Sequence, residues 1–451
     1  MRQAAEEIAE LKGLVERQRQ EIERLKQLLE EALGKVAKGK QPDVKPGQAK
    51  SRMLGPWPAR KERAAEFNHG RLRMEPTETR RHELEGCPVC GEQLVGGNIG
   101  CRREVIDIPA KIPVRITEHQ TIRRKCMTCN AWHAPQVDLS NEVSGQQRFG
   151  HNLVAWVCYL KQRMRLPFAK IQELVGEQMG LHISAGELVG MIKQAATKGK
   201  DAGQQLVAAI RNQPAVHADE TSWREGGRNG WVWLITTAKG WSWFDFAFSR
   251  ATAEIERLLP NYAGTLMCDF YAVYNFIGAN RQRCWAHLTR DMRELHETHA
   301  AAHPDLVPWI AALEQTYTDA RDFVTKNPTA PKHARRQMAI SLGDCVHRLS
   351  DRWLHVRDHP AHAMCQRLRR HEDELFQFVR QRGIDSTNNR AERALRPLVI
   401  GRKISGGTRS PEGTQAHMLL HSLATTWAAR GLSVLDSFRS LLHGAPPVLG
   451  V

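Results

Sequence analysis

Hydrophobic positions in residues 1–37 recur at seven-residue intervals. Isoleucine, valine or leucine fills one heptad position throughout, at Ile8, Val15, Ile22, Leu29 and Val36. The position three residues later is apolar except at Gln18, and charged residues cover the other faces. This pattern is typical of a coiled coil, which we expect to join the chain to a second copy as a homodimer or larger assembly. An amphipathic helix packed on its own body is the alternative.

Residues 38–80 have little apolar periodicity and many lysines and arginines. They predict a basic linker without a core of its own. Such a segment is suited to electrostatic contact with a phosphate backbone, and equally to service as a solvated tether.

Helical periodicity dominates residues 146–200. One helix is predicted near Asn152–Arg163 and a second over Phe168–Met179. After a glycine-containing turn, Ser184 can cap a third helix that we expect to reach about Ala196. A helix, a short turn and a capped helix are typical of a helix-turn-helix, although paired short helices also occur in any α-rich region.

Alternation typical of strands begins after residue 210. Within residues 210–284 we predict the order β-β-β-α-β, with strands at Ala215–Thr221, Gly230–Thr237, Trp241–Phe248 and Gly264–Asp269 and a helix at Ala251–Leu259. Two long antiparallel strands after the first match the opening of an RNase H-like fold. In that topology the first and fourth strands lie side by side.

Helical spacing returns in residues 285–383 and again near the C-terminus. In the first of these segments apolar residues recur at helical intervals, at Leu306, Trp309, Ile310, Leu313, Tyr317, Ala320 and Phe323. The segment is longer than the rest of such a core requires, so we expect an all-helical insertion that contacts DNA or covers the active site. Residues 384–445 then complete the core, with a first helix that Ser386, Thr387 or Asn388 can cap and a closing helix at Ala416–Arg430.

The net charge of the chain indicates what kind of partner it binds. Lysine and arginine outnumber aspartate and glutamate by 65 to 49, which gives a net charge of +16. This excess favours DNA over an anionic membrane as the partner, because no apolar run approaches the length of a spanning helix. Met1–Glu10 is acidic and does not resemble a signal peptide. We therefore expect a cytoplasmic, nucleoid-associated protein with reduced cysteines.

Two C-x-x-C pairs in residues 81–140 predict a structural zinc ion. The four thiolates are Cys87, Cys90, Cys126 and Cys129. Between the pairs, short strands are predicted at Val105–Ile108, Val114–Ile116 and Thr121–Arg123, as in a zinc ribbon. Four thiolates close a tetrahedral site, so this zinc would be architectural. Alternative ligands are Cys101, His119 and His133.

These segments together predict the fold class. We expect a multidomain α+β and α/β protein with an RNase H-like catalytic core and an all-helical insertion. A coiled coil, a zinc ribbon that contacts DNA and a helical DNA-binding region precede this core.

Three carboxylates are candidates for a metal-dependent active site. Asp219 lies near the end of the first predicted strand of the core, and Asp269 closes the fourth. Glu392 lies on the helix that follows the insertion. Enzymes that cut phosphodiesters by in-line displacement use such carboxylates to hold two divalent ions. The pattern therefore predicts two magnesium or manganese ions as cofactors.

Two residues near these acids leave alternatives open. Strand alternation groups Asp219 with His217 and Thr221 and places Glu220 on the opposite face, which separates the two acids only weakly. His287 is either a structural histidine or a contact to the scissile phosphate.

Basic residues surround and follow Glu392. Arg390, Arg393 and Arg396 are expected to neutralise the carboxylates and to hold the DNA backbone. The glycine-rich run Gly401–Ser410 adds three further candidates for phosphate contact, Arg402, Lys403 and Arg409, although a flexible loop has the same composition.

Four stretches, in this order, resemble the insertion sequence 66 family of bacterial DDE transposases. They are His217–Trp223 (HADETSW), Met267–Asn275 (MCDFYAVYN), Cys284–Leu288 (CWAHL) and Thr387–Lys403 (TNNRAERALRPLVIGRK). The resemblance implies that Asp219, Asp269 and Glu392 are the catalytic triad, and that Asp219 rather than Glu220 is its first acid. Phe270 stands where the second motif usually has glycine.

The resemblance also implies a DNA transposase. Such an enzyme binds the terminal repeats of its element, hydrolyses phosphodiester bonds to free 3′-OH ends and joins these to target DNA, with accessory proteins of the same element as further partners. Two other functions stay open: a DNA-binding regulator without catalysis, and a structure-specific nuclease of the same fold. The complete set of acids argues against the regulator, and the order of the motifs favours transposition.

Overall fold

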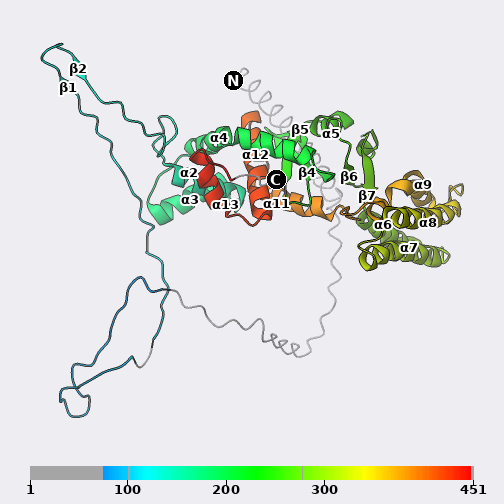
Figure 1. Ribbon diagram of the computed structural model, residues 1–451, viewed down its shortest axis with the longest axis horizontal. Coiled ribbons are helices and arrows are strands. Elements are labelled where there is room, and N and C mark those ends of the chain that lie inside the picture. Colours follow the sequence, from blue (N-terminus) through cyan, green and yellow to red (C-terminus); the bar gives the residue numbers. More distant parts are fainter. Residues whose placement is uncertain (1–74, 100–101, 277, 448–451) are drawn as a thin grey trace, which may run out of the picture. The chain divides into compact units, whose positions relative to one another are not determined.

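The computed structural model describes residues 75–99, 102–276 and 278–447 (Figure 1). The coiled coil predicted at 1–37, most of the basic linker and Cys101 lie outside the described residues. The chain divides into two compact units, which meet in sequence at Asp107 and Ile108.

The strands predicted between the two C-x-x-C pairs do not form. In the described residues 75–99 and 102–123 there is neither helix nor strand, and the first strands are β1 (Arg124–Lys125) and its antiparallel partner β2 (Trp132–His133). The prediction was wrong because it rested on β-branched composition. Strand preference depends on a surface to pack against, and Val105, Ile116 and Ile122 are all exposed.

In the described residues before the sheet, the chain forms helices α2 (His151–Gln162), α3 (Phe168–Met179) and α4 (Ala185–Arg211). Ser184 caps α4 as predicted, since its hydroxyl accepts the Glu187 N–H while the Glu187 carboxylate accepts the Ser184 N–H. Helix α4 continues far beyond the predicted end at Ala196. Its small residues permit a close approach of other elements: a Cβ at Gly203 would lie 2.4 Å from Leu419 Cδ1.

The central sheet has five strands in the order β5-β4-β3-β6-β7. They are β3 (Ala215–Glu225), β4 (Arg228–Thr236), β5 (Ser242–Ala247), β6 (Thr265–Cys268) and β7 (Asn280–Arg283), with α5 (Thr252–Leu258) between β5 and β6. Strands β3, β4 and β5 are antiparallel, whereas β6 and β7 run parallel to β3. The predicted order β-β-β-α-β is thus confirmed.

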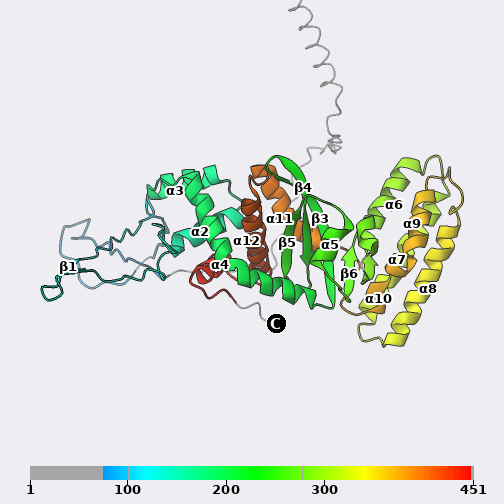
Figure 2. The same ribbon diagram turned by 90° about the horizontal axis from the view of Figure 1, so that it is seen from above.

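Helices cover both faces of this mixed sheet (Figure 2). On one face Leu234 and Phe244 pack against Leu395 of α11 (Asn389–Ser405) and Met418 of α12 (Pro411–Ala429). On the other face Trp233 and Ile235 belong to a larger core with α4, α5, α12 and α13 (Val434–Leu442). The face under α11 is the one that carries the candidate acids.

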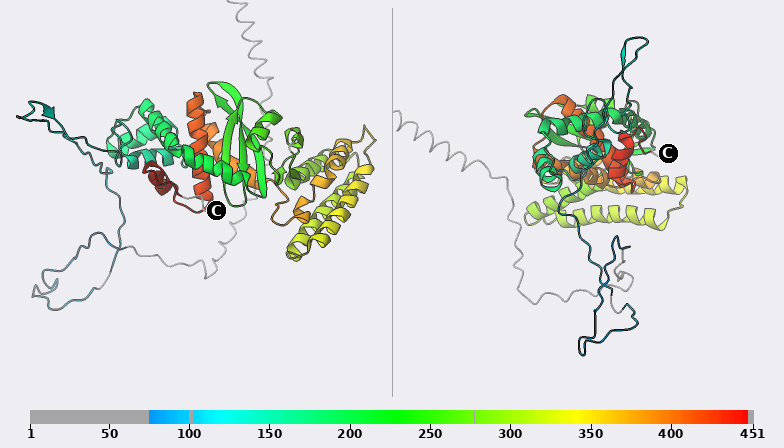
Figure 3. Two further views of the ribbon diagram at one scale, coloured as in Figure 1. Left: turned by 45° about the horizontal axis from the view of Figure 1, so that its top comes forward. Right: turned by 90° about the vertical axis from the view of Figure 1, so that its left-hand side faces the viewer.

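Between β7 and α11 the chain forms a helical body with a core of its own (Figure 3). It consists of α6 (Trp285–His299), α7 (Leu306–Lys326), α8 (Lys332–Asp351), α9 (His362–His371), the 3₁₀ turn η3 (Glu372–Glu374) and α10 (Gln377–Arg380). Trp285 is fully buried and stacks on Tyr317 at 4.5 Å. No helix in the described part of the chain is long and apolar enough to cross a membrane.

Candidate functional site

Strand β3 carries Asp219, and the loop after β6 begins with Asp269. Strand β3 extends to Glu225, so Asp219 lies in mid-strand and not near the strand end as predicted. The parallel pairing of β3 with β6 sets the positions of Asp219 and Asp269 along the strands, and in this pairing His217 lies opposite Met267. Asp219 and Asp269 each follow this pair by two residues, so they occupy the same level and the same face of the sheet.

Glu392 lies in the first turn of α11, which packs over β3 and β4. The pKa of Asp219 is raised to about 7, first by burial and then by the negative charges of Glu220, Asp269 and Glu392, against an opposing hydrogen bond from the Glu220 N–H. Three acids from separate parts of the chain therefore lie within electrostatic range of one another. Their ligand oxygens are not all within 4.8 Å of each other, as a compact single-ion site would require.

Glu220 differs from Asp219 in that its carboxylate is already bound by other side chains of the protein. Its carboxylate accepts the Arg250 Nε–H at 3.0 Å and the Tyr274 hydroxyl at 2.5 Å, and only 2% of its side chain is exposed. Burial raises the pKa of Glu220, and the bonds from Tyr274 and Arg250 oppose this effect. In the described part of the chain, the carboxylate of Asp219 accepts a hydrogen bond from the adjacent Glu220 N–H, at 2.9 Å, and has no side-chain partner of this kind. The geometry thus favours Asp219 as the acid available for a ligand.

Arg283 of β7 holds the main chain at Asp269 and is itself paired with Glu374 of the helical body. Arg283, fully buried, donates from Nη1 to the Asp269 carbonyl at 2.7 Å and from Nε to Glu374 at 2.6 Å. The Asp269 carboxylate accepts the Tyr271 N–H at 2.8 Å, which shapes the turn after β6. Phe270 points toward the helices, where its ring meets His371 at 5.6 Å.

Asn388 connects α11 to β3 beside Asp219, a role that the sequence did not reveal. It was expected to cap the helix, and it occupies the N-cap position without making a side-chain cap bond. Its amide instead donates to the Ala218 carbonyl at 2.8 Å, and its oxygen lies 3.1 Å from His217 Nδ1. His217 Nε2 in turn lies 3.2 Å from Asp385. The asparagine is fully buried and therefore fixes the position of Glu392 one turn later.

The basic side chains nearest to Glu392 come from α6 and not from its own helix. His287 Nε2 lies 3.6 Å and Arg290 Nη2 4.0 Å from its carboxylate. Arg390 instead pairs with Asp385 at 3.3 Å, and Arg393 borders a cavity on a different side of α11. Helical rotation of about 100° per residue turns both arginines away from Glu392, whereas Arg396 shares its side and is exposed.

The basic run Gly401–Ser410 is not a flexible loop. Helix α11 continues to Ser405, and the Arg402 guanidinium donates to the Ser222 carbonyl and the Thr221 hydroxyl of β3. The following turn is also fixed to β3, because the Thr408 N–H bonds to the Arg224 carbonyl at 2.9 Å. Lys403 and Arg409 remain exposed, as contact with a phosphate backbone requires.

The two C-x-x-C pairs form similar tight turns. Cys90 and Cys129 are each followed by a left-handed residue, Gly91 and Asn130. Hydrogen bonds from the second cysteine of each pair lower the pKa of the first, Cys87 or Cys126, which favours the thiolate that a metal requires. His133 Nε2 lies 3.3 Å from Cys129 Sγ, whereas His119 lies 3.6 Å from Glu142.

One other group in the described chain has a metal-like composition: His303, Asp305 and His359, with ligand atoms within 4.8 Å of one another. His359 Nδ1 accepts the Ala361 N–H at 3.2 Å. This bond leaves the proton on Nε2, the atom that faces Asp305. A metal-binding histidine instead donates from its second nitrogen, so this group fits a histidine–aspartate pair better than a metal site.

Residues 146–416 match the sequence model of the family described as Transposase IS66 family. The chain belongs to this family. The resemblance seen in the four sequence motifs is thereby confirmed.

Two similar proteins come from Sinorhizobium fredii. The uncharacterized protein y4qI is 22% identical over 313 residues, which cover 63% of this chain and 57% of that protein. The uncharacterized protein y4jO is 27% identical over 242 residues, which cover 52% of this chain and 69% of that protein. This IS66-family chain thus covers little more than half the length of the first relative.

Proposed function

We propose that the protein is a DNA transposase whose active site is formed by Asp219, Asp269 and Glu392 on an RNase H-like core. The observation that carries the proposal is the convergence of these acids on one face of the sheet, expressed in the raised pKa of Asp219. Family membership supports DNA cleavage and joining as the activity. The mixed sheet, with three antiparallel strands followed by parallel ones, is in keeping with the RNase H-like topology.

The acids fit a pair of magnesium or manganese ions in chemistry. Hard divalent cations prefer carboxylate oxygens, and the mutual repulsion around Asp219 is what a bound cation would relieve. When bound, two such ions would supply charge stabilisation for the attacking and leaving oxygens of an in-line displacement. Asn388 and Arg283 keep the acids in place through the Ala218 and Asp269 carbonyls.

Basic side chains near the acids are proposed to hold the DNA strand. Arg290 and His287 lie beside Glu392, and Lys403 and Arg409 are exposed farther along the same part of the chain. This set revises the role expected of Arg390 and Arg393. Arg402 is proposed to act indirectly, since its guanidinium is engaged with β3.

Outside the core, the proposal includes one structural zinc ion on Cys87, Cys90, Cys126 and Cys129. The lowered pKa values of Cys87 and Cys126 support it. Dimerisation through the heptads of residues 1–37, end recognition by the helices around α3 and α4, accessory proteins and a nucleoid-associated location are part of the same proposal.

The test is cleavage and strand transfer on DNA that carries the ends of the element, with magnesium. Asp269→Asn should lower both rates roughly a hundredfold or more, because removal of a metal ligand forfeits several kcal/mol of transition-state stabilisation. Asp344→Asn on the exposed side of α8 is the matched control and should retain full activity. Unchanged activity of Asp269→Asn would refute the assignment, and cleavage without strand transfer would indicate a nuclease.

A further inference from the structure

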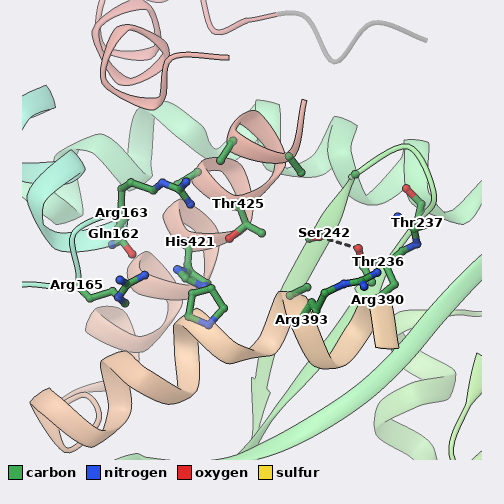
Figure 4. Close-up of a pocket in the computed structure, with 16 residues that line it drawn as sticks. Gln162, Arg163, Arg165, Thr236, Thr237, Ser242, Arg390, Arg393, His421 and Thr425 are labelled. Atoms are coloured by element: carbon green, nitrogen blue, oxygen red, sulfur yellow. Dashed lines mark hydrogen bonds between the residues drawn. The ribbon is translucent and has the colours of Figure 1, made fainter. Parts of the chain in front are cut away.

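A cavity of about 310 Å³ lies beside α11, on a different side of the helix from Glu392 (Figure 4). Its walls come from the end of α2, the turn between β4 and β5, α11 and α12. The volume is at the lower end of the range for small-ligand pockets. Neither the candidate acids nor the cysteine turns contribute to it.

The charge of the lining is entirely positive. Arg163, Arg165, Arg390 and Arg393 border the cavity, and no aspartate or glutamate does. Arg390 pairs with Asp385 at 3.3 Å, whereas the other three arginines form no ion pair with a carboxylate of the described residues. Guanidinium groups form paired hydrogen bonds with phosphate oxygens. Four of them around one cavity therefore select an anion, with phosphate as the best geometric match.

Two buried polar side chains also face this cavity. Gln162 and His421 are each 3% exposed, and both polar atoms of each lack a hydrogen-bond partner in the described chain. Buried polar groups are usually paired, so these two indicate a ligand with polar edges. Burial and the charges of Arg165 and Arg163 lower the pKa of His421 to about 4. The neutral ring and the amide can each donate and accept, as recognition of a base edge requires.

The backbone of Arg165 adopts a conformation that is rare for a residue with a side chain. Its φ is +63°, in the left-handed region that normally favours glycine after a helix. Figure 4 shows Arg165, Arg163 and Gln162 on one side of the cavity and Arg390 and Arg393 on the other, with His421 between them. An arginine kept in a glycine conformation at such a site points to a function for its side chain.

We propose that this cavity binds a nucleotide. The phosphate contacts the arginines, and the base lies against Ala394, Pro397 and Ala424 with its polar edge toward Gln162 and His421. The nucleotide is either one turned out of a DNA strand or a free mononucleotide. The first source rests on the proposed function, since α11 borders both the acids and this cavity.

The first experiment is calorimetry of the full chain with each of the four deoxynucleoside monophosphates and with inorganic phosphate. At least one nucleotide should bind tenfold or more tightly than phosphate, which corresponds to about 1.4 kcal/mol. Arg165→Gly should weaken nucleotide and phosphate alike by about tenfold and keep the fold, because glycine suits the left-handed backbone. Gln162→Leu should remove the preference for nucleotide over phosphate. Arg336→Ala, at an exposed position of α8, is the charge control and should change neither.

A second experiment distinguishes the sources. When the protein binds element-end DNA that carries a single 2-aminopurine, the fluorescence of this base should increase if it leaves the base stack. Gln162→Leu should reduce this increase. Tight mononucleotide binding without brightening assigns the cavity to the free nucleotide. Equal affinity for nucleotides and phosphate, or an unchanged preference in Gln162→Leu, refutes the nucleotide site. Wild-type nucleotide binding without DNA cleavage would contradict the proposed function alone, and cleavage without nucleotide binding would contradict only this inference.

Discussion

Glu374 joins the helical body to the strand ends beside Asp269. Its replacement by glutamine should change both the stability of the protein and its DNA cleavage, and the two can be measured separately. Its carboxylate pairs with the Nε–H groups of Arg281 at 2.7 Å and of Arg283 at 2.6 Å and lies 2.9 Å from His371 Nδ1. Burial opposes ionisation, but the bonds from His371 and the charges and bonds of Arg283 and Arg281 lower the pKa of Glu374 to about 2.

The magnitude follows from that pKa. The difference from the ordinary value of 4.5 corresponds to about 3 kcal/mol of folding free energy. Since the folded pKa is lowered, this stability is fully present above pH 4.5 and is lost as the pH falls toward about 2. The side chain is 18% exposed, so solvent screening reduces the value only modestly. Glu374→Gln should therefore destabilise the protein by about 2–3 kcal/mol at pH 7 and progressively less below pH 4.5.

The assay is urea unfolding followed by circular dichroism at pH 7, 4.5 and 3.5, with Glu314→Gln at an exposed position of α7 as control. The variant should also lose DNA cleavage at temperatures where it is folded, because Arg283 holds the Asp269 carbonyl. A stability difference below about 1 kcal/mol at pH 7, or one that is the same at all three pH values, would refute the reasoning.

Three further predictions concern the parts that frame the site. Asn388→Ala should destabilise by about 2–4 kcal/mol, measured by thermal unfolding, because it leaves the Ala218 carbonyl and His217 Nδ1 buried without partners; cleavage should fall with it, and a fully active variant would contradict the positioning role. Gly407→Ala should cost about 1–3 kcal/mol in the same assay, since φ is +110° and its Cβ would lie 2.2 Å from the Arg224 carbonyl oxygen; an unchanged melting temperature would be the contrary result. Cys126→Ser should lower the zinc content measured by mass spectrometry by one ion per chain, whereas Cys345→Ser should leave it unchanged, and equal zinc in both variants would count against the zinc site.

The sequence by itself determined much of the local structure from α2 onward, although not the end of α4. The limits of α3, the capping of α4 by Ser184 and the order β-β-β-α-β were predictable because periodicity and caps depend on residues close in the chain. The helical body after Trp285 was predictable for the same reason. Asp219, Asp269 and Glu392 were candidates because chemistry and the family motifs marked them.

The tertiary structure decided which residues meet. Strand β7 (Asn280–Arg283) has a polar sequence, and its burial depends on partners such as Glu374. Asn388 bonds to His217 across 171 residues of sequence, a contact that no local pattern specifies. Packing of α11 on the sheet turned Arg390 and Arg393 away from Glu392 and toward the cavity. Side-chain direction on a helix depends on which face the rest of the chain buries, and this explains why the acids were predictable and their surroundings were not.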